Sequence, residues 1–276
     1  MSPASEPSDS VSAASLSKAA GALGDAVARL TGERAGRDRD ATYDRRGAAS
    51  ALSGVVSGVA TAVKAGGKGA VVGGSFLADL LATTATRLPL RDKEALDQQH
   101  PGLDTEQIAD SLVDTASRIS GTIGGAAGGL AAAQWLATPS LIAVPVELAA
   151  ETLLVAAVEL KLVAELHEIY DARPPGDLSD RATAYLGSWT AQRGLSGEGQ
   201  TVGLASRLAS AGTAALRKRI TGRLARNLGS FLPFLAGAVI GARNNSSGTR
   251  KLSRRLRADL TAAPQRIPSR RLAEPS

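Results

Sequence analysis

The sequence predicts an all-α fold, a single Gly/Ala-rich multi-helix bundle with disordered N- and C-terminal tails. Apolar residues recur at helical spacing along most of the chain, whereas alternation with period two is nearly absent. The apolar content of 43% comes mainly from Ala, Leu and Val, while aromatic residues make up only 3% and glycines number 30. Such a core consists of closely approaching backbones, and a chain of 276 residues can bury one of sizeable volume.

The two ends of the chain differ in composition from its middle. Residues 1–46 are first rich in Ser, Pro and Ala and then strongly charged, with one short helix predicted at about Val11–Leu30. We expect this segment to lie outside the helical domain, which we place at residues 47–260. Residues 261–276 are predicted to form a disordered basic tail.

The first half of the domain contains two apolar helices, Ala48–Val63 and Ala70–Leu88, of which Pro89 ends the second. A further helix begins near Asp104. Its apolar stripe consists of Ile108, Leu112, Thr115 and Ile119. The run Ile119–Val146 has no charged residue but is interrupted by Pro139 and Pro145, which predicts a hydrophobic hairpin.

The second half of the domain begins with the longest predicted helix. The predicted helices are Pro145–Tyr170, Ser179–Ala191, Gly203–Leu228, Leu232–Ala242 and Gly248–Leu260. The first of them is apolar on most of its surface, so we expect it to lie at the centre of the domain.

Glycines spaced four residues apart occur in three of these segments. The sets are Gly54 and Gly58; Gly121, Gly125 and Gly129; and Gly237 and Gly241. Each set lies on one helix face and allows a close approach, either of another helix in a soluble bundle or of a lipid surface. No transmembrane helix is predicted, although the hydrophobic hairpin is long enough to become one.

The charge of the chain is +6 and its isoelectric point is near 10.0. In the helix Gly248–Leu260 the leucines Leu252, Leu256 and Leu260 form one stripe. The remaining surface carries Arg250, Lys251, Arg254, Arg255 and Arg257, which are candidate contacts to anionic lipid. In the alternative, the helix only caps the domain, with its leucines turned inward.

Glu159 lies in the middle of the buried stripe of the long helix formed by Leu148, Val155, Leu162, Leu166 and Ile169. A buried carboxylate must be paired, hydrogen-bonded or protonated. We expect an ion pair with an Arg of the helix Gly203–Leu228. A role in binding a ligand, a metal or a proton, and simple exposure to solvent, are the alternatives.

No catalytic, metal or cofactor site is predicted. The chain has no Cys, and its only histidines are His100 and His167; Glu165 precedes His167 by two residues, not by the three that a di-metal carboxylate bundle requires. No Ser/His/Asp arrangement or phosphate-binding glycine loop is recognisable. The basic run Arg217, Lys218, Arg219, Arg223 and Arg226 lacks interleaved aromatic residues, so nucleic acid is not an expected partner.

Two stretches resemble the EcsC family of bacterial helical proteins. Val146–Asp171 is similar to the long central helix of that family, in which a Gly usually follows Tyr170, at the position of Asp171. Arg223–Asn245 is similar to its carboxy-terminal element. The resemblance places the family positions at Tyr170, Pro233, Gly237, Gly241 and Asn244. It implies no specific activity, but suggests a link to membrane transport or the cell envelope.

These observations lead to three functional hypotheses. The first is a non-enzymatic, membrane-associated accessory protein that binds a membrane partner or anionic lipid. The second is a soluble protein with a small-molecule or hydrolytic site near Glu159, and the third is a nucleic-acid binder. Because the amino terminus has no basic region followed by an apolar one, we expect a cytoplasmic location, peripheral at the inner face of the cell membrane.

Overall fold

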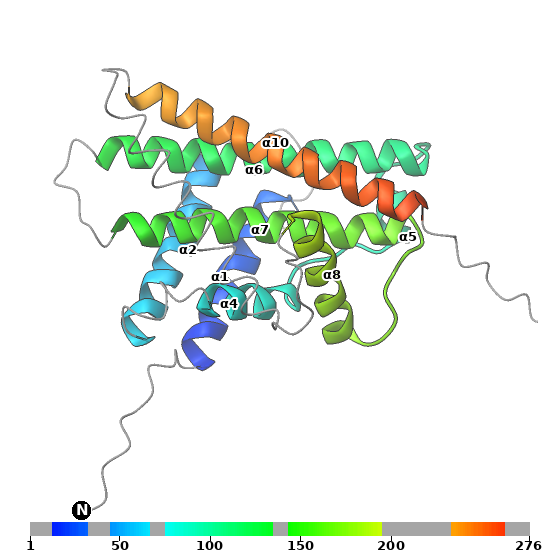
Figure 1. Cartoon of the computed structure of the whole chain (residues 1–276), viewed down its shortest axis with the longest axis horizontal. Helices are drawn as coiled ribbons and strands as arrows, with labels where there is room; N and C mark the ends of the chain where they lie inside the picture. The colour runs from blue at the N-terminus through cyan, green and yellow to red at the C-terminus, as the bar shows by residue number, and fades with distance from the viewer. Residues whose placement is uncertain (1–12, 33–44, 67–74, 135–142, 195–232, 263–276) are drawn as a thin grey trace, which may run out of the picture.

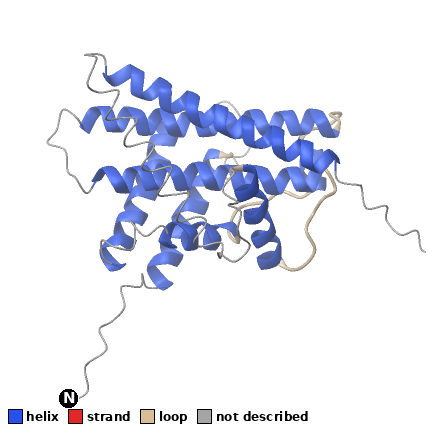
Figure 2. Ribbon diagram, in the orientation of Figure 1, coloured by secondary structure: helices blue, strands red, loops and turns tan. Residues whose placement is uncertain are grey.

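In the computed structural model, the described residues are 13–32, 45–66, 75–134, 143–194 and 233–262. They form helices and connecting turns, and no strand occurs among them (Figure 2). The helices are α1 (Ala13–Leu30), α2 (Arg45–Gly66), α4 (Ser75–Ala85), α5 (Lys93–Gln99), α6 (Thr105–Gln134), α7 (Ala143–Ile169), α8 (Leu178–Gln192) and α10 (Pro233–Ala262). The predicted all-α fold is confirmed over this part of the chain.

Helix α7 is the centre of the bundle and contacts each of the other described helices. In Figure 1, α6 and α10 run side by side above it, and α1, α2 and α4 pack below it. The predicted stripe of α7 is buried, but so are Ala150, Leu154 and Val163 on its other faces. The helix therefore has almost no solvent-facing side, and any polar residue on it needs a partner from a neighbouring helix.

Helix α1 lies inside the domain, whereas we expected the domain to begin only at residue 47. Leu23 and Val27 are fully buried in the common core. Arg87, beyond the end of α4, donates to the carbonyl and hydroxyl oxygens of Ser17 at 2.8 and 2.9 Å. The charged residues that follow α1 suggested a linker, but the apolar face of α1 packs against α2 and α4.

Helix α5 was not predicted, because it is short and mostly polar. Its first turn is capped by Asp92, whose carboxylate accepts a hydrogen bond from the backbone N–H of Ala95 at 2.9 Å. Leu96 is its single buried residue. One apolar anchor and a cap are enough to dock this helix against α7.

Helix α6 continues through the predicted start of the hydrophobic hairpin. Ile119, Ile123 and Ala127 are buried in the core, so the described residues of the hairpin belong to packed helices. Pro145 lies in the first turn of α7, where its missing N–H has no helical partner to lose. Pro139 lies outside the described residues.

Helix α10 is a single helix, although the sequence predicted two with a break at residues 243–247. Asn, Ser and Gly in this region have low helix propensity. The structure compensates with tertiary contacts, since Asn245 is buried and donates from Nδ2 to Oε1 of Glu151 at 3.0 Å. The predicted helix Gly203–Leu228 lies outside the described residues.

Glycines bring α6 and α10 into backbone contact. A Cβ atom at Gly124 would overlap the carbonyl oxygen of Gly241, and a Cβ atom at Gly241 would overlap that of Gly124. At Gly121 a Cβ atom would lie 3.3 Å from the carbonyl oxygen of Ala242. Gly121, Gly124 and Gly241 therefore serve helix packing, which was one of the two interpretations of the glycine spacing.

The turn after α7 has Asp171 in the left-handed conformation, with a φ of 55°. The N–H of Ala172 donates to the carbonyl of His167, and that of Asp171 donates to the carbonyl of Glu168, at 2.8 and 3.2 Å. This is the Schellman arrangement, in which the left-handed position favours Gly. Asp171 also pairs with Lys93 at 2.5 Å.

Candidate functional site

Three of the five cations predicted as lipid contacts have partners within the chain. Nη2 of Arg250 lies 2.9 Å from Oδ1 of Asp114 on α6. Nη1 of Arg255 donates to the carbonyl of Gln192 at 3.0 Å. Arg257, the third, fastens the C-terminal end of α10. These residues attach α10 to the rest of the domain.

Arg257 is the centre of a polar cluster between α10, α6 and the end of α7. It pairs with Glu106 and with Asp110, the latter at 2.6 Å, and its Nε donates to the hydroxyl of Tyr170 at 3.1 Å. The hydrogen bond from Arg257 and a second one from Tyr170 hold the pKa of Glu106 below its usual range. Burial and the bond to Glu106 raise the pKa of Tyr170. The family-pattern residue Tyr170 thus has a structural contact to α10.

The outward face of α10 carries the remaining cations. Lys251 and Arg254 are exposed, and neither makes an ion pair or hydrogen bond within the described part of the chain. The outer stripe, as we name this face, consists of Val239, Ile240, Arg243, Arg250, Lys251 and Arg254. At 3.6 residues per turn these six positions fall within an arc of about 120°.

The outer stripe combines apolar and basic groups. Val239 is 54% exposed and Ile240 37%. Arg243, one turn further on, is also exposed. Leu252 and Leu256 are buried on the opposite side, as the capping alternative required. The arc contains no carboxylate, so its cations are not neutralised along the helix itself.

Glu159 is fully buried and hydrogen-bonded on both oxygens. Oε2 accepts from Nε1 of Trp189 at 3.0 Å and from Nε of Arg193 at 2.9 Å. Oε1 accepts from the hydroxyl of Thr249 at 2.8 Å and pairs with Nη2 of Arg193. The carboxylate is thus a junction between α7, α8 and α10.

The guanidinium partner of Glu159 follows directly after α8, whereas we expected it in the helix Gly203–Leu228. Tyr185, Trp189 and Arg193 are spaced four residues apart and lie on one face, and their polar ends reach Glu168 and Glu159 on α7. This spacing is a signal in the sequence that the prediction of the helix Ser179–Ala191 did not use.

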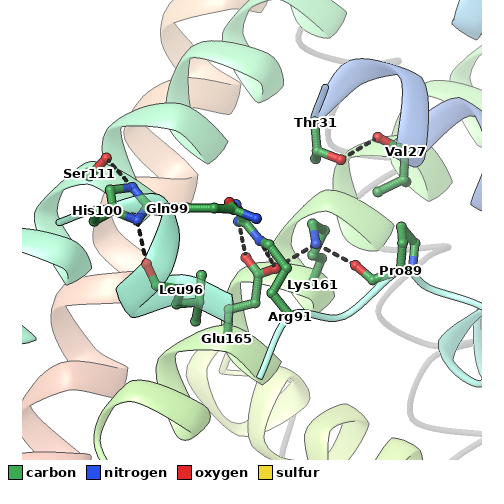
Figure 3. A network of polar contacts seen from close by, with 10 residues as sticks. All are labelled: Val27, Thr31, Pro89, Arg91, Leu96, Gln99, His100, Ser111, Lys161 and Glu165. Carbon is green, nitrogen blue, oxygen red and sulfur yellow. Dashed lines mark hydrogen bonds and ion pairs between the residues drawn. The ribbon is translucent and has the colours of Figure 1, made fainter. Parts of the chain in front are cut away.

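A second buried carboxylate, Glu165, lies at the junction of α7 with the connection between α4 and α5 (Figure 3). Arg91 donates from Nε and Nη2 to its two oxygens, each at 2.8 Å. Nζ of Lys161 lies 2.5 Å from Oε1 and also donates to the carbonyl of Pro89. Burial alone would raise the pKa of Glu165, but the charge of Lys161 and the hydrogen bonds from Arg91 hold it below its usual range.

A small cavity of about 50 Å³ lies beside this network. Nδ1 of His100 lies 2.9 Å from the carbonyl oxygen of Leu96, and because a carbonyl only accepts, Nδ1 carries the proton. Nε2 then accepts from the hydroxyl of Ser111 at 3.2 Å (Figure 3). This Ser–His pair was not predicted. The cavity has room for a few water molecules only, which is too little for a substrate. The contact between His100 and Ser111 joins the end of α5 to α6.

The remaining residues singled out from the sequence lie in or at the ends of packed helices. Pro233 is the first residue of α10, Gly237 lies on the same helix, and Asn244 is exposed. His167 is mostly buried, with Nδ1 donating to the carbonyl of Val163 at 2.8 Å. Within the described ranges, no group of three or more His, Asp or Glu residues could hold a metal ion.

The basic run at residues 217–226 lies outside the described residues, as do residues 1–12 and 263–276, whereas residues 261 and 262 of the predicted C-terminal tail form the end of α10. None of the described helices combines the length and the apolar character that crossing a bilayer requires.

No family model, curated protein or solved structure matches this chain. A functional interpretation therefore has to come from the geometry of the chain's own residues. The outer stripe of α10 combines exposed cations and exposed apolar side chains on one helix face.

Proposed function

We propose that this protein is a non-enzymatic accessory protein that binds the surface of anionic membranes through the outer stripe of α10. The observation that carries the proposal is the exposure of Arg243, Lys251 and Arg254 beside Val239 and Ile240 on one face of one helix. Cations next to apolar side chains are the pattern of helices that lie in a membrane interface.

Electrostatics supplies most of the expected affinity. Each Lys or Arg near an anionic surface contributes about 1 kcal/mol, so the three cations together contribute about 3 kcal/mol. Arg250 adds less, because Asp114 already neutralises part of its charge. A free energy of about 3 kcal/mol corresponds to roughly two orders of magnitude in the partition coefficient.

The apolar residues of the stripe add a short-range term. Val239 and Ile240 lie about one turn before Arg243, so they can enter the interface while the cations stay at the headgroups. Burying such a side chain fully contributes about 1.5–3 kcal/mol, and a peripheral helix gains a part of this. The hydrophobic hairpin is not needed for this contact, since its described residues pack in the bundle.

The proposal extends the resemblance to the EcsC family, which suggests a link to membrane transport at the inner face of the cell membrane. No observation favours a small-molecule or hydrolytic site at Glu159, whose oxygens are occupied by donors from α8 and α10.

The test is co-flotation of the full chain with vesicles of phosphatidylcholine, with and without phosphatidylglycerol. Wild-type protein should float only with the anionic vesicles. Binding should weaken as the Debye length falls from about 10 Å at 0.1 M salt to about 3 Å at 1 M. The triple variant Arg243→Gln, Lys251→Gln, Arg254→Gln should bind about a hundredfold more weakly.

A matched control removes the same charge elsewhere. Lys18, Arg29 and Arg46 are exposed cations on α1 and α2, and their combined change to Gln also lowers the net charge by three. This control should bind nearly as wild type. Equal losses in the two triple variants, or no binding by the wild type, would contradict the proposal.

A further inference from the structure

A second charged feature lies away from α10, in a pocket of about 240 Å³. It is formed by the connection between α4 and α5, the C-terminal end of α7 and the first turns of α8. Its polar lining consists of Arg91, Asp92, Glu168, Arg173, Arg181 and Tyr185. Neither the fold nor the proposed membrane contact uses this pocket.

The carboxylates of the pocket are already satisfied by the chain. Glu168 accepts two hydrogen bonds from Nε of Arg173, at 2.8 and 2.7 Å, and one from the hydroxyl of Tyr185 at 3.2 Å. Asp92 caps α5. Burial, together with the charge of Glu168, raises the pKa of Tyr185 to about 12, so its hydroxyl keeps the proton that it donates. Because these carboxylates already accept hydrogen bonds from the chain, we do not expect the pocket to bind a cation.

Arg181 differs from the other arginines of the pocket. Its one hydrogen bond within the described part of the chain runs from Nε to the carbonyl of Asp177, at 3.3 Å. Its two terminal nitrogens meet no carboxylate there. Arg173 uses Nε and Nη2 on Glu168, which leaves its Nη1 without a described acceptor. Two guanidinium groups thus present N–H donors at one pocket, and oxyanions are what such donors bind best.

The N-terminus of α8 does not need a ligand. Asp177 caps it, and its carboxylate accepts from the N–H groups of Ser179 and Asp180 at 2.8 and 2.9 Å. Any preference of the pocket for anions therefore comes from the arginine side chains.

The rest of the pocket is apolar. Leu90 and Ala182 line it together with Leu178, whose side chain is 50% exposed. An exposed leucine lies beside guanidinium N–H groups that have no acceptor in the described part of the chain. This combination is suited to a ligand with both an apolar and a charged part. The volume is below the range of about 300–1,000 Å³ that drug-sized ligands occupy, so the ligand is small.

We infer that this pocket binds a small organic oxyanion, a phosphate or carboxylate attached to an apolar group, through Arg181 and Arg173 and against Leu178. The phosphate group of a lipid headgroup has the same chemistry as a free phosphate ester. Both sources use the same donors, and the experiment separates them.

The experiment titrates isotope-labelled full-length protein with phenyl phosphate and follows amide resonances by NMR. Saturable shifts are expected in α8 and in the residues after α7. Arg181→Met should weaken the affinity at least about tenfold, the effect of one lost charge-assisted contact. Arg118→Met, which removes an exposed arginine of α6, should leave it unchanged.

Benzyl alcohol, which lacks the oxyanion, should produce no saturable shifts in these residues. Inorganic phosphate, which lacks the apolar group, should bind more weakly than phenyl phosphate. Absence of saturable binding, equal affinity in Arg181→Met, or equal affinity for inorganic phosphate would overturn the inference. Arg181 is not buried, so the variant is expected to fold, and its spectrum without ligand checks this.

Flotation of Arg181→Met with anionic vesicles identifies the source of the ligand. A loss of vesicle binding that matches the loss for phenyl phosphate assigns the pocket to a headgroup. Unchanged flotation assigns it to a free molecule. The outer-stripe variant of α10 should bind phenyl phosphate like the wild type, so failure of the membrane proposal and failure of this one are distinguishable.

Discussion

Removing the carboxylate of Glu159 should destabilise the protein more than any change at an exposed carboxylate. In Glu159→Leu, Nε1 of Trp189 loses its acceptor inside the core, whereas the hydroxyl of Thr249 still has the carbonyl of Asn245 at 3.1 Å. Each unsatisfied buried group costs about 1–3 kcal/mol. Arg193 is 30% exposed along its side chain, so it can turn partly to water and adds less. We expect a loss of about 3–5 kcal/mol in the free energy of unfolding.

The measurement is urea unfolding followed by far-UV circular dichroism, at neutral pH, with the slope against denaturant compared between variants. Glu159→Gln keeps the size and one acceptor oxygen but turns an amide donor toward other donors. It should therefore cost about 2–3 kcal/mol. Glu94→Gln, at an exposed carboxylate of α5, is the control and should change stability by less than about 0.5 kcal/mol.

A double variant separates the ion pair from the other hydrogen bonds. Combining Glu159→Leu with Arg193→Leu removes both charges. The double variant should therefore lose at least about 1 kcal/mol less stability than the sum of the losses in the two single variants. A cost for Glu159→Leu below about 1 kcal/mol, with an unchanged slope, would refute the view of Glu159 as a structural junction.

Three further outcomes follow from the fold. Gly124→Ala should lower stability by about 3 kcal/mol, because the new methyl group overlaps the backbone of Gly241; an unchanged melting temperature would contradict this packing. Asp171→Gly should raise stability by about 0.5 kcal/mol, since glycine tolerates the φ of 55° and the exposed pair with Lys93 contributes little; guanidinium unfolding measures the change. Burial lowers the pKa of His167, so the unfolded chain takes up that proton first and stability should fall as the pH drops below about 6.5; His167→Gln should flatten this part of the profile.

The helices that the sequence predicted best are those with a continuous run of helix-forming residues between clear start and stop signals. The predicted span Ser179–Ala191 differs from α8 by one residue at each end. The long central helix was placed almost as closely, because its apolar residues leave no doubt about period or length. Local pattern is sufficient where the apolar run and its boundaries lie within one stretch of sequence.

Prediction failed where tertiary contacts override local propensity. The Gly/Ala run of α6 and the Asn/Ser run of α10 both indicate breaks when each is taken alone. In the fold they face each other, and Gly124 against Gly241 allows the two backbones to touch. The partner of each run lies more than a hundred residues away, so no window of sequence contains the information.

The candidate site was predicted by residue type but not by partner. Glu159 was identified as a buried carboxylate, while Arg193 and Arg91 were not recognised as the cations that meet the carboxylates of α7. Similarly, Lys251 and Arg254 were identified among five cations, and only the structure separates them from Arg257, which is fastened to α6.

The inner contacts of α10 determine the direction in which its outer stripe points. Thr249 holds the inner face to Glu159 on α7, while Lys251 lies two residues further, about 200° around the helix. The inner contacts therefore fix the rotation of α10 and keep the outer stripe pointed away from the bundle. Glu159→Gln should lower stability, yet the folded fraction should bind anionic vesicles with wild-type affinity, because Thr249 keeps an acceptor. Vesicle binding measured well below the unfolding midpoint tests this, and a loss of affinity in fully folded Glu159→Gln would show that the remaining inner contacts do not hold α10 in this rotation.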